Sequence, residues 1–116
     1  VRIASGVRIE SGVRIESGVR IDSNVQIGSD VWIESDVRIG SGVQVEQDCY
    51  SLGFADGYHK GLVPVQGVAW IGASCRWFTL ADALRHWENH SEDRALTLCL
   101  MQSAIAIAKL KGLKHE

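Results

Sequence analysis

The sequence predicts a mainly β protein in which a triangular solenoid of about three coils is followed by a pair of C-terminal helices. Two observations lead to this expectation. Residues 1–48 divide without a gap into eight hexapeptides: VRIASG, VRIESG, VRIESG, VRIDSN, VQIGSD, VWIESD, VRIGSG and VQVEQD. From residue 80 onward, apolar residues recur at helical spacing instead.

Each hexapeptide predicts one short strand and one corner. The first residue is Val in all eight units and the third is Ile or Val, with a polar residue between them. This alternation is typical of a strand with one buried face. The sixth residue is Gly, Asn or Asp, which tolerate positive φ and therefore favour a corner. No residues remain for an antiparallel return, so the chain must keep turning one way, with three units to a coil.

Stacked coils would place the outward side chains in three rows. The rows are Arg2, Arg20 and Arg38; Arg8, Gln26 and Gln44; and Arg14, Trp32 and Tyr50. The row of arginines suggests an anion site, but acidic residues lie close to each arginine, so we favour an ordinary solvated face. Trp32 and Tyr50 are large aromatics on an otherwise charged surface. We expect them to contact protein, from another subunit or from the C-terminal part, rather than to stack on a ligand.

Charge and hydropathy exclude two kinds of partner. The net charge is −2, and residues 1–48 hold five basic and eight acidic side chains. A nucleic-acid binder normally has a basic excess over its footprint, so we predict no nucleic-acid partner. No apolar run approaches the length of a membrane span, and no signal peptide is recognisable. We therefore expect a cytoplasmic protein, or an assembly component of a virion.

The repeat resembles a known family. Ile27-Gly28-Ser29-Asp30-Val31-Trp32 and Ile39-Gly40-Ser41-Gly42-Val43-Gln44 are similar to the Ile-Gly-x-x-Val-x hexapeptide of left-handed parallel β-helix proteins. This hexapeptide-repeat superfamily includes many trimeric acyltransferases, and the resemblance covers residues 1–48. It implies a left-handed sense for the coils and a homotrimer. It leaves activity open, because carbonic anhydrases, binding proteins and purely structural members belong to the same superfamily.

The repeat gives way to a different pattern after residue 52. We assign residues 1–52 to the β-helix and residues 53–78 to a glycine-rich loop with a partial extra coil or hairpin. The stretch GFADGYHKGLVPVQG predicts a loop with one short strand at Leu62–Val65. Residues 71–76 fit the hexapeptide again in a shifted phase. We favour a partial coil or strand that extends the solenoid there, with a short hairpin against the last coil as the alternative.

Residues 79–116 predict two helices that cap the solenoid and assemble subunits. Thr79 is a suitable N-cap for a helix at residues 80–89. Ser91 would cap the second helix, with Glu92 and Asp93 in its first turn, and Gly112 would end it. The apolar arc of the second helix is wider than one packing surface needs. We expect the helices to cover the solenoid's open end or one face, and the remaining apolar surface to meet symmetry mates. The predicted interface residues are Trp32, Tyr50, Trp87, Leu96, Leu100, Met101, Ile105 and Ile107.

Cysteine and histidine offer little chemistry in this chain. Cys49, Cys75 and Cys99 follow no motif spacing, and we expect small buried residues in a reducing compartment. His86 and His90 have the i, i+4 spacing that can bind zinc, but no third ligand is evident, so we predict no metal site.

His59 is the one candidate catalytic residue. The hexapeptide acyltransferases place a His on or near a protruding loop, where it acts as a general base toward a hydroxyl or amine. The resemblance implies that role for His59, with Tyr58 and Lys60 beside it and Asp56 orienting the imidazole. The acyl donor would be acetyl-coenzyme A.

Two functions therefore remain open. We favour a non-enzymatic structural or interaction module: a rigid homo-oligomeric β-helix, trimeric through its helices, without a cofactor. The alternative is a small acyltransferase that uses acetyl-coenzyme A and His59.

Overall fold

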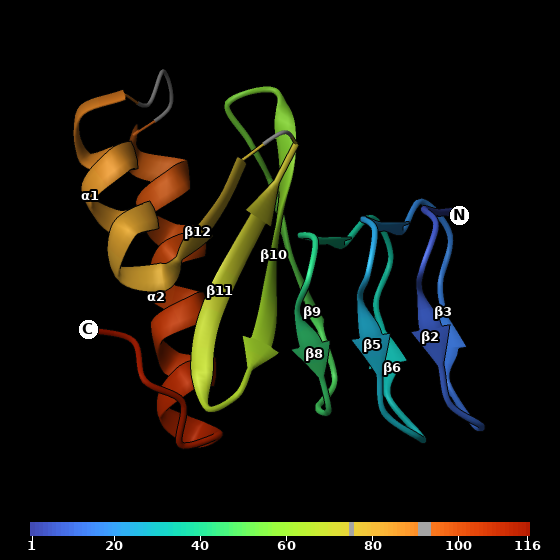
Figure 1. The fold of residues 1–116 in the computed structure, drawn as a ribbon. Helices are drawn as coiled ribbons and strands as arrows, with labels where there is room; N and C mark the ends of the chain where they lie inside the picture. Colours follow the sequence, from blue (N-terminus) through green and yellow to red (C-terminus); the bar gives the residue numbers. More distant parts are fainter. Residues whose placement is uncertain (75, 91–93) are drawn as a thin grey trace.

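The computed structural model describes residues 1–74, 76–90 and 94–116, which form three layers. Figure 1 shows the repeat segment at one end, an antiparallel sheet in the middle and two helices at the other end. The repeat segment supplies eight two-residue strands: β1 Arg2–Ile3, β2 Arg8–Ile9, β3 Arg14–Ile15, β4 Arg20–Ile21, β5 Gln26–Ile27, β6 Trp32–Ile33, β7 Arg38–Ile39 and β8 Gln44–Val45.

These strands pair in parallel with the register that the hexapeptides predict. The sheets are β1-β4-β7, β2-β5-β8 and β3-β6, so the chain visits three sheets in turn and then returns to the first. Arg2 pairs with Arg20 and Arg20 with Arg38. We call three successive hexapeptides one coil. The three predicted rows of outward side chains are confirmed up to Trp32, which pairs with Arg14.

The corners adopt the backbone conformation expected of their residue types. Gly18 has φ of 76°, and Asp36, at the same corner of the next coil, has φ of 66°. Asn24 and Asp30 also have a left-handed backbone conformation, with positive φ. The amide of Asp36 donates to the carbonyl of Ser17 at 3.0 Å, which joins the corners of adjacent coils.

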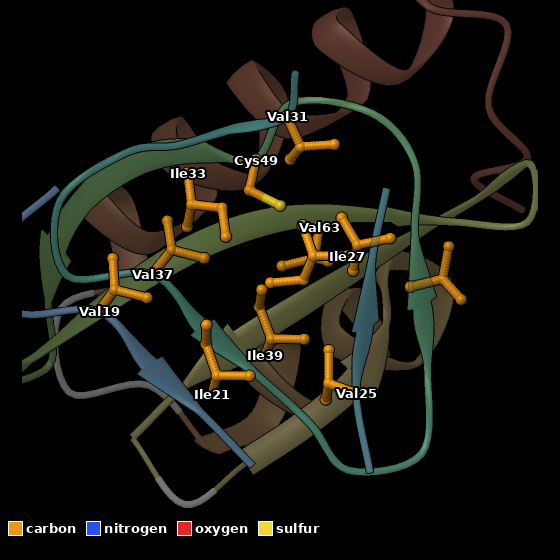
Figure 2. Packing of buried hydrophobic residues seen from close by; sticks show 12 residues of the cluster. Val19, Ile21, Val25, Ile27, Val31, Ile33, Val37, Ile39, Cys49 and Val63 are labelled. Carbon is orange, nitrogen blue, oxygen red and sulfur yellow. The ribbon is translucent and has the colours of Figure 1, made fainter. Parts of the chain in front are cut away.

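Valine and isoleucine side chains fill the interior of the coils, together with Cys49 and Val63 (Figure 2). The interior is closed at the end near β8 and open at the end near β1. Val19, Val25 and Val37 are fully buried, whereas Ile3 and Ile9 of the first coil are 49% and 40% exposed. Burial therefore increases along the repeat toward the antiparallel sheet.

The antiparallel sheet consists of β9 Tyr50–Ala55, β10 Tyr58–Val65, β11 Val68–Ala73 and β12 Arg76–Thr79, in the order β12-β11-β10-β9. The prediction of a loop with one short strand is wrong here. At residues 71–76, where the pattern favours a partial coil or strand over a hairpin, the structure has antiparallel strands, β11 and β12, with β11 lying against β7, and the described residues form no partial coil. Two tight turns explain the difference. Asp56 and Gly57 both have positive φ, as do Gln66 and Gly67, and such pairs suit two-residue hairpins.

The sheet separates the coils from the helices by the alternation of its side chains. Val63 and Val65 of β10 join the core of the coils, while Leu62 faces the helices. In β11, Ile71 also faces the helices, and Gly72 lies against β7. The end of the coils is therefore covered by the sheet and not by the helices directly, which corrects the predicted place of the helix pair.

The helices are α1 Leu80–His90 and α2 Arg94–Leu110. The Thr79 hydroxyl accepts a hydrogen bond from the Asp82 amide at 3.2 Å, which confirms the predicted N-cap of α1. The predicted cap at Ser91, with Glu92 and Asp93, lies outside the described residues. Neither described helix is long and apolar enough to span a membrane.

Candidate functional site

His59 lies on the face of β10 that is turned toward the coils. Its Nε2 atom is 2.7 Å from the Oγ of Ser51 on β9, within hydrogen-bond distance. The residue is 9% exposed. Burial lowers the pKa of His59 below its ordinary value, and the nearby Asp36 carboxylate opposes this effect. The imidazole is therefore held neutral at neutral pH.

The predicted orienting role of Asp56 is wrong. The Nδ1 atom of His59 is buried without a hydrogen-bond partner. The Asp56 carboxylate instead accepts a hydrogen bond from the Thr97 hydroxyl of α2 at 2.7 Å and lies 3.8 Å from the Lys60 Nζ. Asp56 sits in the β9–β10 turn and faces the helices, whereas His59 faces the coils.

Lys60 also points away from His59, because neighbouring residues of a strand face opposite sides of the sheet. Its ammonium donates to the carbonyl of Ala55 at 2.7 Å. It lies 4.4 Å from the ring centroid of Tyr58 and 4.9 Å from that of Trp87. Burial lowers the pKa of Lys60, and Asp56 opposes that shift. Lys60 is fully buried, so it belongs to the core between the sheet and the helices.

A pocket of about 260 Å³ opens beside His59, between the β9–β10 hairpin and the outer face of sheet β1-β4-β7. It is lined by Gly18, Arg20, Asp36, Arg38, Phe54, Tyr58, His59 and Ser74. We call it the hairpin pocket. Its walls come from adjacent coils, the hairpin and the residue that follows β11.

Arg38 is the most buried cation of the hairpin pocket. Its side chain is 16% exposed, and its Nη2 donates to the Asp22 carboxylate at 2.6 Å. The Nε and Nη1 atoms are buried without a hydrogen-bond partner. The sequence placed Arg38 in a row of arginines, but nothing in it indicated that a hairpin would cover this residue. The existence of the hairpin itself could have been predicted from Asp56-Gly57, a favoured two-residue turn between two apolar runs.

Phe54 forms the apolar part of the hairpin pocket. Its side chain is 61% exposed. The Phe54 and His59 rings meet edge to face, with centroids 5.2 Å apart and planes at 72°. The pocket therefore combines guanidinium groups with an accessible aromatic ring.

The structure divides the predicted interface residues into three groups by their burial. Trp87 and Met101 are 1% and 0% exposed in the chain's own core, so a neighbouring subunit does not reach them. This corrects their assignment and follows from the sheet, which supplies the surface that they cover. Four more are partly buried and pack against the same core: Tyr50, Leu100, Ile105 and Ile107.

Trp32 and Leu96 are the two predicted interface residues that remain exposed, each by 43%. The Trp32 indole donates to the Glu16 carboxylate at 2.9 Å, and the Arg14 guanidinium carbon lies 4.8 Å from the ring centroid. Side chains of the preceding coil therefore hold the Trp32 ring. Leu96 belongs to an exposed row of α2 that the sequence did not separate from the buried face.

This row, which we call the α2 stripe, runs along the outer side of the helix. It consists of Leu96, Cys99, Ser103, Ala106 and Leu110, all exposed. The opposite side of α2 is buried and contains Thr97, Met101, Ala104 and Ala108. The spacing within the α2 stripe alternates between three and four residues, as in the seam of a coiled coil.

The other titratable candidates do not gather into a site. Within the described part of the chain, no three His, Cys, Asp or Glu side chains could jointly hold a metal ion. His86 lies against Phe78, with ring centroids 5.1 Å apart. Cys49 is buried, and burial raises the pKa of its thiol. Cys99 is exposed, contrary to expectation, and Cys75 lies outside the described residues.

Comparison with known proteins bears on the repeat segment alone. Residues 12–47 match the family model described as bacterial transferase hexapeptide (six repeats), so this part of the chain is a hexapeptide-repeat segment, as the resemblance implied. The search of curated proteins and the search of solved structures each gave no match. The family contains transferases and structural members, so the match establishes the repeat and leaves the function open.

Proposed function

We propose that this chain is a structural module that assembles with copies of itself through α2. In this proposal the repeat is a left-handed β-helix whose end near β8 is closed by the antiparallel sheet. The assembly is a homotrimer without a cofactor. The observation that supports it best is the α2 stripe, an exposed row of apolar and small residues on the helix face that the sheet does not cover.

The composition of the α2 stripe favours contact with another helix. Leu110 is 84% exposed, and burying such a side chain contributes about 1.5–3 kcal/mol. Cys99, Ser103 and Ala106 are small, which lets a second helix approach closely. Lys109 is the one charged residue between Ala95 and Leu110. A stripe without strong charge complements an identical stripe, so we infer that the partner is a second and third copy of the chain.

The resemblance of the repeat to the hexapeptide-repeat family supports an assembly of three subunits. Hexapeptide-repeat proteins often form trimers. Three α2 helices around a threefold axis would bury all three stripes in one seam and close the assembly. The coils would then stand around the seam with their outer faces free.

A matched pair of substitutions tests the role of the α2 stripe. Ala106 and Ala4 are both exposed alanines, the first in the stripe and the second in the first coil. Ala106→Arg places a charge in the seam and should convert trimer to monomer in sedimentation equilibrium. Ala4→Arg adds the same charge elsewhere and should leave the mass of the trimer unchanged. Equal behaviour of both variants would contradict assembly through α2.

The acyltransferase alternative has less support from the geometry. A general base needs a ring nitrogen free to take a proton from the acceptor. The Nε2 of His59 is engaged with Ser51 and its Nδ1 is buried. We therefore expect no protein-dependent release of coenzyme A from acetyl-coenzyme A, measured by chromatography with a mixture of amine and hydroxyl acceptors. Release that His59→Ala abolishes would establish the enzyme instead.

A further inference from the structure

Arg38 has donors that the chain does not satisfy. A guanidinium has five N–H donors, and Arg38 directs one of them, on Nη2, to the carboxylate of Asp22. Nε and Nη1 are buried without an acceptor. Burying charged donors without acceptors is unfavourable. An anion beside the exposed part of Arg38 would therefore meet a guanidinium that water screens less than it screens a fully solvated arginine.

A second arginine lines the same pocket. Arg20 occupies the neighbouring position of the sheet, paired in register with Arg38, and its residue is exposed. Adjacent strands lie about 4.8 Å apart, so one group with several oxygens can reach both guanidinium groups. The lining carries the two guanidinium groups and the Asp36 carboxylate, while the Asp22 carboxylate pairs with Arg38 from outside the lining. Arg20 is therefore the more accessible of the two cations.

The rest of the pocket favours a ligand with an apolar body. Phe54 lines the pocket and leaves 61% of its surface exposed. His59 is held neutral by its burial, so it adds no charge to this side. A flat or apolar group that covers the Phe54 ring would remove its surface from water.

We propose that the hairpin pocket binds a small organic anion, whose carboxylate or phosphate group lies between Arg20 and Arg38 and whose apolar body covers Phe54. The volume of about 260 Å³ limits the ligand to a small molecule. All residues of the site come from one chain, so this site does not depend on the proposed trimer.

Calorimetric titration with three probes tests this proposal. Phenyl phosphate, benzoate and inorganic phosphate separate the two possible anionic groups from the apolar body. We expect phenyl phosphate or benzoate to bind more tightly than inorganic phosphate, because only the first two cover Phe54. Whichever of phenyl phosphate and benzoate binds more tightly, which we call the better probe, identifies the anionic group as phosphate or carboxylate. Phe54→Ala should weaken that probe and leave the binding of inorganic phosphate unchanged.

Charge-removing variants provide the control. Arg38→Gln and Arg20→Gln should each weaken the better probe by about tenfold or more, since each removes a charge-assisted hydrogen bond. Arg8→Gln removes the same charge from a different sheet and should change nothing. If Arg38→Gln fails to fold, the affinities of Arg20→Gln and Arg8→Gln for the same probe are compared instead. A loss in Arg20→Gln alone would support the proposed site. No binding of any probe, or equal losses in all arginine variants, would overturn the proposal.

Discussion

The carbonyl oxygen of Arg38 occupies the space that a Cβ atom at Gly72 would need. This contact joins β7, the last strand of the parallel sheet β1-β4-β7, to β11 of the antiparallel sheet. Gly72 is buried, and the neighbouring β11 residue Ile71 packs against the helices. At Gly72 the coils and the antiparallel sheet therefore meet backbone against backbone, which leaves no side chain that could move aside.

Gly72→Ala should consequently lower the free energy of unfolding by about 2 kcal/mol or more, the range of an overpacked core. Gly28→Ala is the matched control, because a Cβ there would meet its nearest atoms at an ordinary 3.6 Å. Neither glycine has positive φ, so the difference reports the contact alone. Chemical denaturation of both variants measures it. Equal stability would mean that β11 does not lie on β7 in this way.

A second glycine pair tests the corners of the repeat. Gly18 and Gly42 both have φ of 76°, so Ala costs about 1–2 kcal/mol of backbone strain at either position. A Cβ at Gly18 would also clash with the Asp36 side chain, whereas a Cβ at Gly42 meets no atom within 4 Å. Gly18→Ala should therefore destabilise by about 1 kcal/mol more than Gly42→Ala. A larger loss from Gly42→Ala would contradict the stacking of these corners.

The hexapeptides predicted more of this fold than any other part of the sequence did. Val and Ile at fixed positions of every unit determine which side chains enter the coils, and the period determines that Arg14 meets Trp32. Local composition was enough there because each unit repeats the same geometry. Thr79 likewise revealed the start of α1, since an N-cap is a local interaction.

The antiparallel sheet and the candidate site were harder to predict. The glycines of residues 53–67 suggested a loop, although Gly61 lies within a strand whose two faces pack against different layers. Pro64 lacks the amide donor of a regular strand residue, but it lies beyond the last pair of β10 with β9, Leu62 with Tyr50. Arg38 and His59 come together only through this sheet, so no local signal could place them in one pocket.

Lys60 offers a test of the layer between the sheet and the helices. Lys60→Met keeps most of the volume but removes the cation that serves the carbonyl of Ala55 and the carboxylate of Asp56. Breaking a buried pair on one side costs about 3–5 kcal/mol. We expect a loss of that order in chemical denaturation. Lys114→Met, at an exposed lysine, should change stability by less than about 0.5 kcal/mol.

His59 should make stability depend on pH. Its pKa in the folded state is lowered from the ordinary value of 6.5, so below that value the unfolded chain binds a proton more readily. The contribution of neutral, buried His59 to the free energy of unfolding is present in full above pH 6.5. It is lost as the pH falls through the lowered pKa of the folded state. The wild type should therefore lose more stability than His59→Gln between about pH 7.5 and about pH 5. Parallel profiles would show that His59 is not buried as a neutral group.

The mass of the chain in solution tests the central claim most directly. Assembly through three α2 stripes predicts a species with three times the mass of the 12.7 kDa chain in sedimentation equilibrium, and Ala106→Arg should reduce it to that of the single chain. A wild-type protein that stays at 12.7 kDa over a wide range of concentration would contradict the account of a self-assembling module.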